Sequence, residues 1–118
     1  MIAQLLILAQ LGATSTATDV IRVNQLGYLP DAPKVAVFCS LAKREISTFR
    51  VADDNGRIVV ERAAQPAKGF GPCAATYRLD FSSLKKDGSY RISAGDAVSP
   101  IVRVRSNAYA GAADTLLY

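Results

Sequence analysis

The residue types that carry most enzyme chemistry are scarce in this sequence. Histidine is absent, which excludes a Ser-His-Asp triad, a Cys-His nucleophile and a histidine-based zinc or iron site within these residues. Two cysteines are too few to form a zinc site from cysteine alone. Carboxylates are the remaining candidates, and Asp53 and Asp54 form the one adjacent pair. Neighbouring side chains of an extended segment diverge, so this pair does not suit acid/base chemistry on one bond.

The other carboxylates show no spacing that indicates a site. Asp80, Asp87, Asp96 and Glu61 stand alone, and no segment has the regularly spaced oxygen ligands of a calcium-binding loop. The glycine stretch near residue 70 precedes a proline and not a helix, so it does not predict a phosphate-binding loop. The sequence therefore predicts no catalytic residue, no metal ligand and no cofactor.

The length of 118 residues, 12.6 kDa, suits one domain. Lys and Arg total 14 against 10 Asp and Glu, a formal net charge of +4. A basic groove for nucleic acid would gather these charges beside aromatic residues. Instead the arginines are spread along the chain beside apolar residues, which indicates the solvent face of several strands and no nucleic-acid partner. These arginines are Arg22, Arg50, Arg78, Arg91, Arg103 and Arg105.

Residues 1–17 have features of a secretory signal peptide. Met1 to Ala13 form an apolar run too short to span a bilayer, and the small residues Ser15 and Ala17 suit a following cleavage point. No Lys or Arg precedes the run, so a short apolar helix or a misassigned start stays open as an alternative. A signal peptide predicts a secreted or periplasmic domain, in which a disulfide can form, and no membrane association after cleavage.

From Val20 onward the hydrophobic pattern has the two-residue period of β-strands. Gly, Pro, Asn and Asp separate the strands, most clearly in the hairpin signal Asp53-Asp54-Asn55-Gly56. This spacing predicts an all-β fold, an immunoglobulin-like antiparallel β-sandwich of about seven strands over residues 18–106. The seven runs lie near residues 20–24, 35–39, 48–51, 58–61, 77–81, 89–92 and 102–105. In the fourth run Ile58 and Val60 are expected to share the core-facing side.

The two cysteines lie where a bridge can form. In the immunoglobulin order the second and fifth runs are antiparallel neighbours, so the end of one lies beside the start of the other. Cys39 ends the second run, and Cys73 begins the fifth. By parity Cys39 shares a face with Val35 and Val37, and Cys73 shares one with Tyr77, so both are expected on the inner face. A disulfide and two separate buried thiols both fit this placement.

Tyr90 is a candidate for a tyrosine corner. It lies just inside the sixth run, after Leu84 and the polar turn of residues 85–89. In such a corner the tyrosine hydroxyl bonds back to the backbone just upstream. The alternative is an ordinary core tyrosine without that bond.

The segment Arg22-Val23-Asn24-Gln25-Leu26-Gly27-Tyr28-Leu29-Pro30, followed by the lysine-led strand Lys34-Val35-Ala36-Val37, is the most specific motif. It resembles the opening of the N-terminal immunoglobulin-like domain of family-nine glycoside hydrolases, the cellulases. Residues 49–51, 56–59, 79–84, 88–92 and 99–104 are similar to later strands of that domain, so the resemblance covers residues 20–105. Cys73 departs from the family pattern, in which the glycines of that stretch are usual but the cysteine is not.

The resemblance implies a fragment of a longer enzyme. Residues 107–118 resemble a linker and the first helix of the family's catalytic helical barrel. In the family, an Asp of an Asp-Ala-Gly-Asp motif and a distant Glu cleave β-1,4-glucan with inversion, and neither motif occurs here. The implied role is a non-catalytic accessory module of a secreted β-1,4-glucanase. It would pack against and stabilise the catalytic domain of the same polypeptide, and it would meet β-glucan only through the parent enzyme.

Two other functions stay open. A carbohydrate-binding module would need a row of exposed aromatic residues, but Trp is absent and Tyr77, Phe81 and Tyr90 are expected in the core. The second of these functions is a cell-surface adhesion domain with no enzyme attached. An Asp-Ala-Gly-Asp segment encoded after Tyr118 would separate the enzyme from the free domain.

Overall fold

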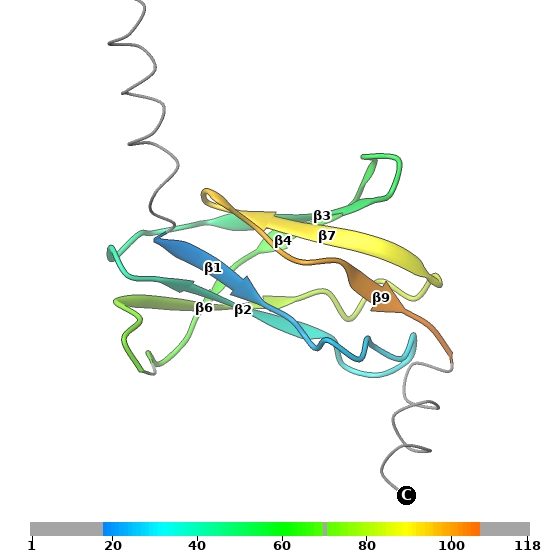
Figure 1. Cartoon of the computed structure of the whole chain (residues 1–118), viewed down its shortest axis with the longest axis horizontal. Helices are drawn as coiled ribbons and strands as arrows, with labels where there is room; N and C mark the ends of the chain where they lie inside the picture. Colours follow the sequence, from blue (N-terminus) through cyan, green and yellow to red (C-terminus); the bar gives the residue numbers. More distant parts are fainter. Residues whose placement is uncertain (1–17, 70, 107–118) are drawn as a thin grey trace, which may run out of the picture.

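The computed structural model of the protein describes residues 18–69 and 71–106, which form two stacked β-sheets (Figure 1). The described residues contain nine strands and no helix. The all-β, immunoglobulin-like sandwich predicted from the sequence is confirmed. The strands are β1 (Asp19–Arg22), β2 (Val35–Ser40), β3 (Thr48–Asp53), β4 (Ile58–Ala63), β5 (Gln65–Pro66), β6 (Ala75–Asp80), β7 (Gly88–Ala94), β8 (Ala97–Val98) and β9 (Val102–Val104).

The two sheets are built from antiparallel pairs. One sheet has the order β1-β2-β6-β5, and the other has the order β4-β3-β7, with β8 and β9 each pairing with β7. The chain crosses to the second sheet for β3 and β4 and then returns, which places Ser40 opposite Ala75 in the β2–β6 pair. The predicted pairing of the second and fifth runs is therefore confirmed.

All seven predicted runs are strands, namely β1 to β4, β6, β7 and β9. The structure adds β5 and β8, which have two residues each. Two residues are too few for an alternating pattern to appear, so neither strand carries a sequence signal.

The core lies between the facing sides of the two sheets. Phe38 and Leu79 of one sheet and Val51 and Ile92 of the other are fully buried there. The six arginines assigned to the solvent face from the sequence are all exposed. Strand alternation thus separates the apolar interior from the basic exterior.

Two predicted core faces are wrong. In β2 the core residues are Ala36 and Phe38, whereas Val35 and Val37 are half-buried on the other side. Both faces of β2 are apolar, so alternation alone does not identify the inner one. In β4 Ile58 is 50% exposed although Val60 is buried, because the β3–β4 register shifts next to Val51.

The described strands begin at Asp19 and end at Val104, inside the range expected for the sandwich. The expected signal peptide over residues 1–17 and the expected linker and helix start over residues 107–118 lie outside the described residues. Over residues 18–69 and 71–106, no helix is long and apolar enough to cross a membrane.

Candidate functional site

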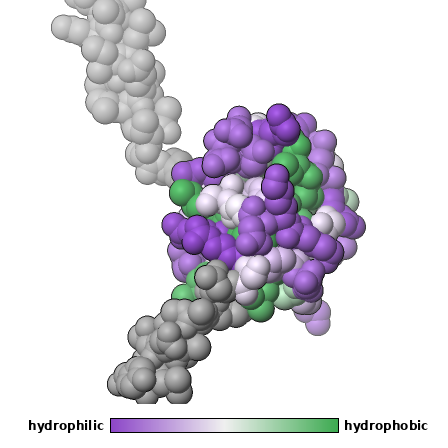
Figure 2. All heavy atoms as spheres, turned by 90° about the vertical axis from the view of Figure 1, so that its right-hand side faces the viewer, coloured by the Kyte–Doolittle hydropathy of each residue, from purple (hydrophilic) through white to green (hydrophobic). Residues whose placement is uncertain are grey.

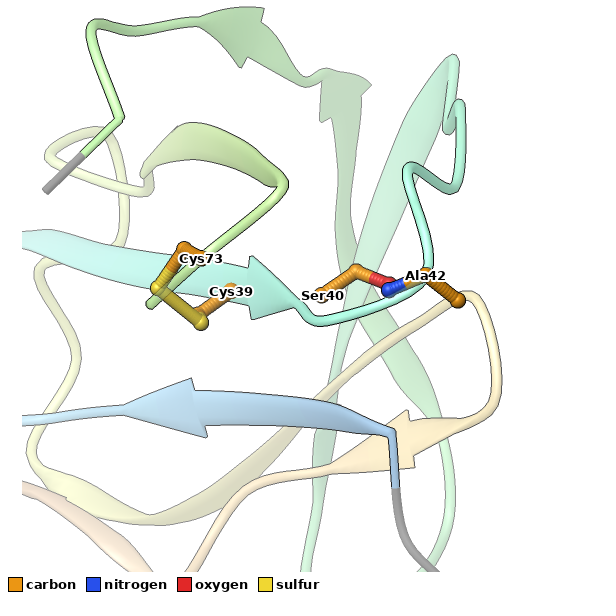
Figure 3. The surroundings of a disulfide bond; sticks show 4 residues. All are labelled: Cys39, Ser40, Ala42 and Cys73. Atoms are coloured by element: carbon orange, nitrogen blue, oxygen red, sulfur yellow. A yellow bond between two sulfur atoms is a disulfide. The ribbon is translucent and has the colours of Figure 1, made fainter. Parts of the chain in front are cut away.

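Cys39 and Cys73 form a disulfide that joins β2 to the segment before β6 (Figure 3). The two sulfur atoms are 2.06 Å apart, the Cα atoms are 5.4 Å apart, and the cysteines are 34 residues apart in sequence. Beside the bridge, the buried Ser40 hydroxyl accepts a hydrogen bond of 3.1 Å from the Ala42 amide, where the chain leaves β2. The bridge and this turn together fix the end of β2.

The disulfide lies on the outer face of its sheet, so the expectation that both cysteines point inward is wrong. Cys39 directly follows the core residue Phe38 in β2, so its side chain points to the opposite face of the sheet. Cys39 is not part of the core cluster. The two cysteines share a pocket with Val20 and Arg22, whose side chains are exposed on β1. Cys73 precedes β6, so the strand parity used in the prediction does not extend to it.

The Tyr90 hydroxyl donates a hydrogen bond of 2.7 Å to the carbonyl oxygen of Lys86 in the turn before β7. This is the geometry of a tyrosine corner. Burial raises the pKa of the Tyr90 phenol, and the nearby carboxylate of Asp53 adds to the shift. A Cβ atom at Gly88 would lie 3.0 Å from the Tyr90 hydroxyl, so glycine at this position lets the ring reach the turn.

The carboxylates considered for catalysis hold turns and ion pairs instead. Asp53 accepts two hydrogen bonds from backbone amides of its own hairpin turn. Asp80 accepts a hydrogen bond of 2.9 Å from the Ser82 amide, and the hydrogen bonds from Ser82 lower the pKa of Asp80. Glu61 forms an exposed ion pair of 2.9 Å with Arg50. In the part of the chain that the structure describes, no group of three or more His, Cys, Asp or Glu residues could hold a metal ion.

Residues 23–34, called the exit loop below, connect β1 to β2 and run beside the last strand (Figure 1). The Tyr28 amide donates to the Arg103 carbonyl at 2.7 Å, and the Arg105 amide donates to the Tyr28 carbonyl at 3.0 Å. The Tyr28 hydroxyl donates to the Val35 carbonyl at 3.2 Å and accepts from the Asn24 amide at 2.9 Å. The exit loop is therefore bonded to the last described segment of the chain, which ends at Ser106.

Lys34 is fully buried at the base of the exit loop. Its ammonium group donates to the carbonyls of Pro30 at 2.5 Å, Ala32 at 2.8 Å and Ser82 at 3.4 Å. These three acceptors match the three protons of the ammonium group. Burial lowers the pKa of Lys34, and the nearby charge of Lys85 lowers it further. The lysine thus ties the exit loop to the segment after β6.

An ionic cluster lies at the other end of the sandwich. Arg44 contacts Asp19 with Nε at 3.2 Å and Asp96 with Nη1 at 2.9 Å. The Asp19 side chain is 2% exposed, whereas that of Asp96 is 75% exposed. Because Asp19 belongs to β1 and Asp96 to the β7–β8 turn, the cluster joins the two sheets.

Sequence reasoning did not assign these structural roles to Tyr28, Lys34 or Asp19. Tyr28 lies inside the motif that carries the family resemblance, and Lys34 begins the strand that follows it. This resemblance is the one feature of the sequence that marks the two residues. Their burial follows from contacts between distant segments, such as the hydrogen bond between Lys34 and Ser82, which are 48 positions apart in the sequence. No local pattern reports such a contact.

The sequence profile of the cellulase N-terminal Ig-like domain matches residues 16–99 of this chain. A cellodextrinase from Butyrivibrio fibrisolvens is 33% identical over 91 residues, which cover 74% of this chain and 15% of that protein. Endoglucanase C from Cellulomonas fimi is 35% identical over 71 residues, which cover 58% of this chain and 6% of that protein.

A solved structure, that of a GH9 protein from Bacteroides ovatus, has the same fold, with a TM-score of 0.71 and 28% sequence identity. The match covers 83% of this chain and 18% of that one. The chain therefore spans less than a fifth of the length of each of these three proteins.

Proposed function

Because this chain belongs to the family of cellulase N-terminal immunoglobulin-like domains, we propose that it is the non-catalytic accessory module of a secreted β-1,4-glucanase. The module packs against a catalytic domain that follows it in the same polypeptide, and it stabilises that domain. The observation that carries the proposal is the match over residues 16–99 to a domain that forms only a small part of its relatives.

The geometry of the carboxylates supports a role without chemistry. An inverting glycosidase needs two carboxyl groups about 6.5–9.5 Å apart on either side of the scissile bond. Asp53 and Asp80 instead accept hydrogen bonds from backbone amides of their own turns. Glu61 is held by Arg50 on the solvent face. These groups maintain the sandwich and do not converge on a substrate.

A carbohydrate-binding module finds less support. Sugar rings stack on exposed aromatic side chains, and within residues 18–69 and 71–106 the aromatic side chains are buried or half-buried. Tyr77 is half-buried, and the others are at most 6% exposed: Tyr28, Phe38, Phe49, Phe81 and Tyr90. A free adhesion domain differs from the proposed module in having no enzyme attached.

The disulfide supports export of the module, because disulfides persist in oxidising compartments outside the cytosol. We expect the protein in the secreted or periplasmic fraction, without residues 1–17. Fractionation followed by intact-mass measurement tests this. A reduced protein of full mass in the cytosol would contradict it.

The accessory role is tested by comparing this chain with the complete polypeptide encoded by its natural gene. The chain alone should release no reducing sugar from soluble cellulose, whereas the complete polypeptide should do so. Removing residues 18–106 should lower the thermal midpoint of the catalytic domain by about 5 °C or more. Activity of the chain that survives repurification, or a gene that ends at Tyr118, would contradict the proposal.

A further inference from the structure

We infer that the exit loop is the surface on which the following catalytic domain docks, and that this domain meets it with apolar side chains. The contact residues are Leu26, Leu29, Pro30 and Ala32. The inference rests on the proposed function, because it requires a domain joined to the chain after Ser106.

The position of the exit loop is the first reason. A pocket of about 420 Å³ is lined by Leu29, Pro30, Asp31 and Ala32 of the loop together with Ser106, where the described chain ends. The backbone bonds between Tyr28 and the last strand hold this arrangement in place. A domain tethered at Ser106 therefore has a high effective concentration at this surface.

The loop is also fixed in shape before any partner binds. It contains no named strand, yet the Tyr28 hydroxyl and the buried Lys34 ammonium bond to its backbone. Gly27 adopts a φ of 102°, a left-handed conformation that suits glycine and allows the turn before Tyr28. A loop that is already ordered loses little conformational freedom on binding, which favours docking.

The chemistry of the surface matches that of a protein interface. Leu26 is 55% exposed, and Leu29, Pro30 and Ala32 are half-buried. Around them lie the exposed charges of Asp31 and Lys85, whose side chains are 3.8 Å apart. An apolar centre with a charged rim is typical of interfaces. Figure 2 looks at this end of the molecule and shows apolar patches within a mostly hydrophilic surface.

Photo-crosslinking in the complete polypeptide tests the surface directly. A photoreactive amino acid replaces Leu26 or Leu29, and the control replaces Leu41, which is also 55% exposed but follows β2 at the other end of the sandwich. We expect peptides from beyond residue 118 to be captured from positions 26 and 29 about tenfold more than from position 41. Equal capture from all positions, or more capture from position 41, would overturn the inference.

A charge substitution provides the second measurement. Leu29→Asp should raise the rate of protease cleavage between the two domains about tenfold, because it places a charge in an apolar contact. Leu41→Asp should leave that rate unchanged. The unfolding midpoint of each variant in the isolated 118-residue chain controls for loss of folding. Equal cleavage of the two variants, with both of them folded, would contradict the docking surface.

These outcomes separate the interface from the function. A catalytic domain that is stabilised by residues 18–106 but is captured only from position 41 would leave the accessory role intact and place the interface elsewhere. A gene that ends at Tyr118 would overturn both.

Discussion

Tyr90, Tyr28 and Lys34 each carry a polar group into the sandwich, and each of these groups is hydrogen-bonded to backbone atoms of a turn or loop. A buried polar group costs free energy unless it is hydrogen-bonded, so these side chains restrict the loops to one arrangement. Burial also raises the pKa of Tyr90 and lowers the pKa of Lys34. At the residue scale, polar contacts therefore determine the shapes of the connections.

Tyr90→Phe should lower the free energy of unfolding by about 1–2 kcal/mol, because the Lys86 carbonyl loses its donor. Urea denaturation measures the change. Tyr77→Phe, at a half-buried tyrosine outside the turn, is the control and should change it by less than about 0.5 kcal/mol. An unchanged midpoint for Tyr90→Phe would mean that the hydroxyl bond contributes nothing to stability.

The ionised Asp80 should stabilise the fold, so the free energy of unfolding should fall when this carboxylate is protonated in acid. The hydrogen bonds from Ser82 lower the pKa of Asp80 in the folded protein below that of the unfolded chain. The carboxylate therefore stabilises the fold above the unfolded pKa of about 4, and this contribution is lost as the pH falls through the folded pKa. Asp80→Asn should thus weaken the dependence of unfolding free energy on pH in that range. Asp54→Asn, in an exposed turn, is the control, and equal pH profiles for the two variants would refute the assignment.

The strands differ in how clearly their sequences mark their faces. β3 and β9 alternate buried apolar and exposed polar residues, so the pattern identifies both the strand and its inner face. β2 is apolar on both faces, and there the disulfide covers part of the outer one. The bridge links an end of β2, a strand in the middle of its sheet, to the chain that enters β6. The bridge therefore closes the part of the chain, residues 39–73, that includes β3 and β4 of the other sheet.

Replacing both cysteines, Cys39→Ala with Cys73→Ala, should lower the free energy of unfolding by about 3–4 kcal/mol, because the unfolded chain gains the entropy of an open loop. The double substitution avoids leaving a single reactive thiol. Guanidinium denaturation measures the effect, and the unsubstituted protein in reductant should show a similar loss. A change below about 1 kcal/mol would mean that the bridge is not a major source of stability.

On the scale of the whole molecule, the two ends of the sandwich are closed by different means. The exit loop and Lys34 close the end that holds Ser106, the last described residue. At the other end the Arg44 cluster joins β1 to the β7–β8 turn. The end bearing the exit loop is thus held by bonds to backbone carbonyls, which leaves its surface side chains available for a partner.

The two acidic partners of Arg44 should contribute unequally. Asp19→Asn should lower the free energy of unfolding by about 1–2 kcal/mol, because a buried, charge-assisted contact is weakened. Asp96→Asn should cost less than about 0.5 kcal/mol, because its side chain is exposed and the pair is screened by water and salt. Thermal unfolding of both variants provides the comparison. Equal losses would show that burial does not set the strength of these pairs.

The sequence by itself determined the seven longer strands, the immunoglobulin-like class and the family, because alternation, turn residues and the Arg22–Pro30 motif are local signals. It also placed Tyr90 directly after the turn that its hydroxyl contacts. Only the tertiary structure decided which face of β2 is inside, that Ile58 is exposed and that Lys34 is buried. Those properties depend on which surface the opposite sheet covers and on where a bulge shifts the register, and both arise from contacts between residues distant in sequence.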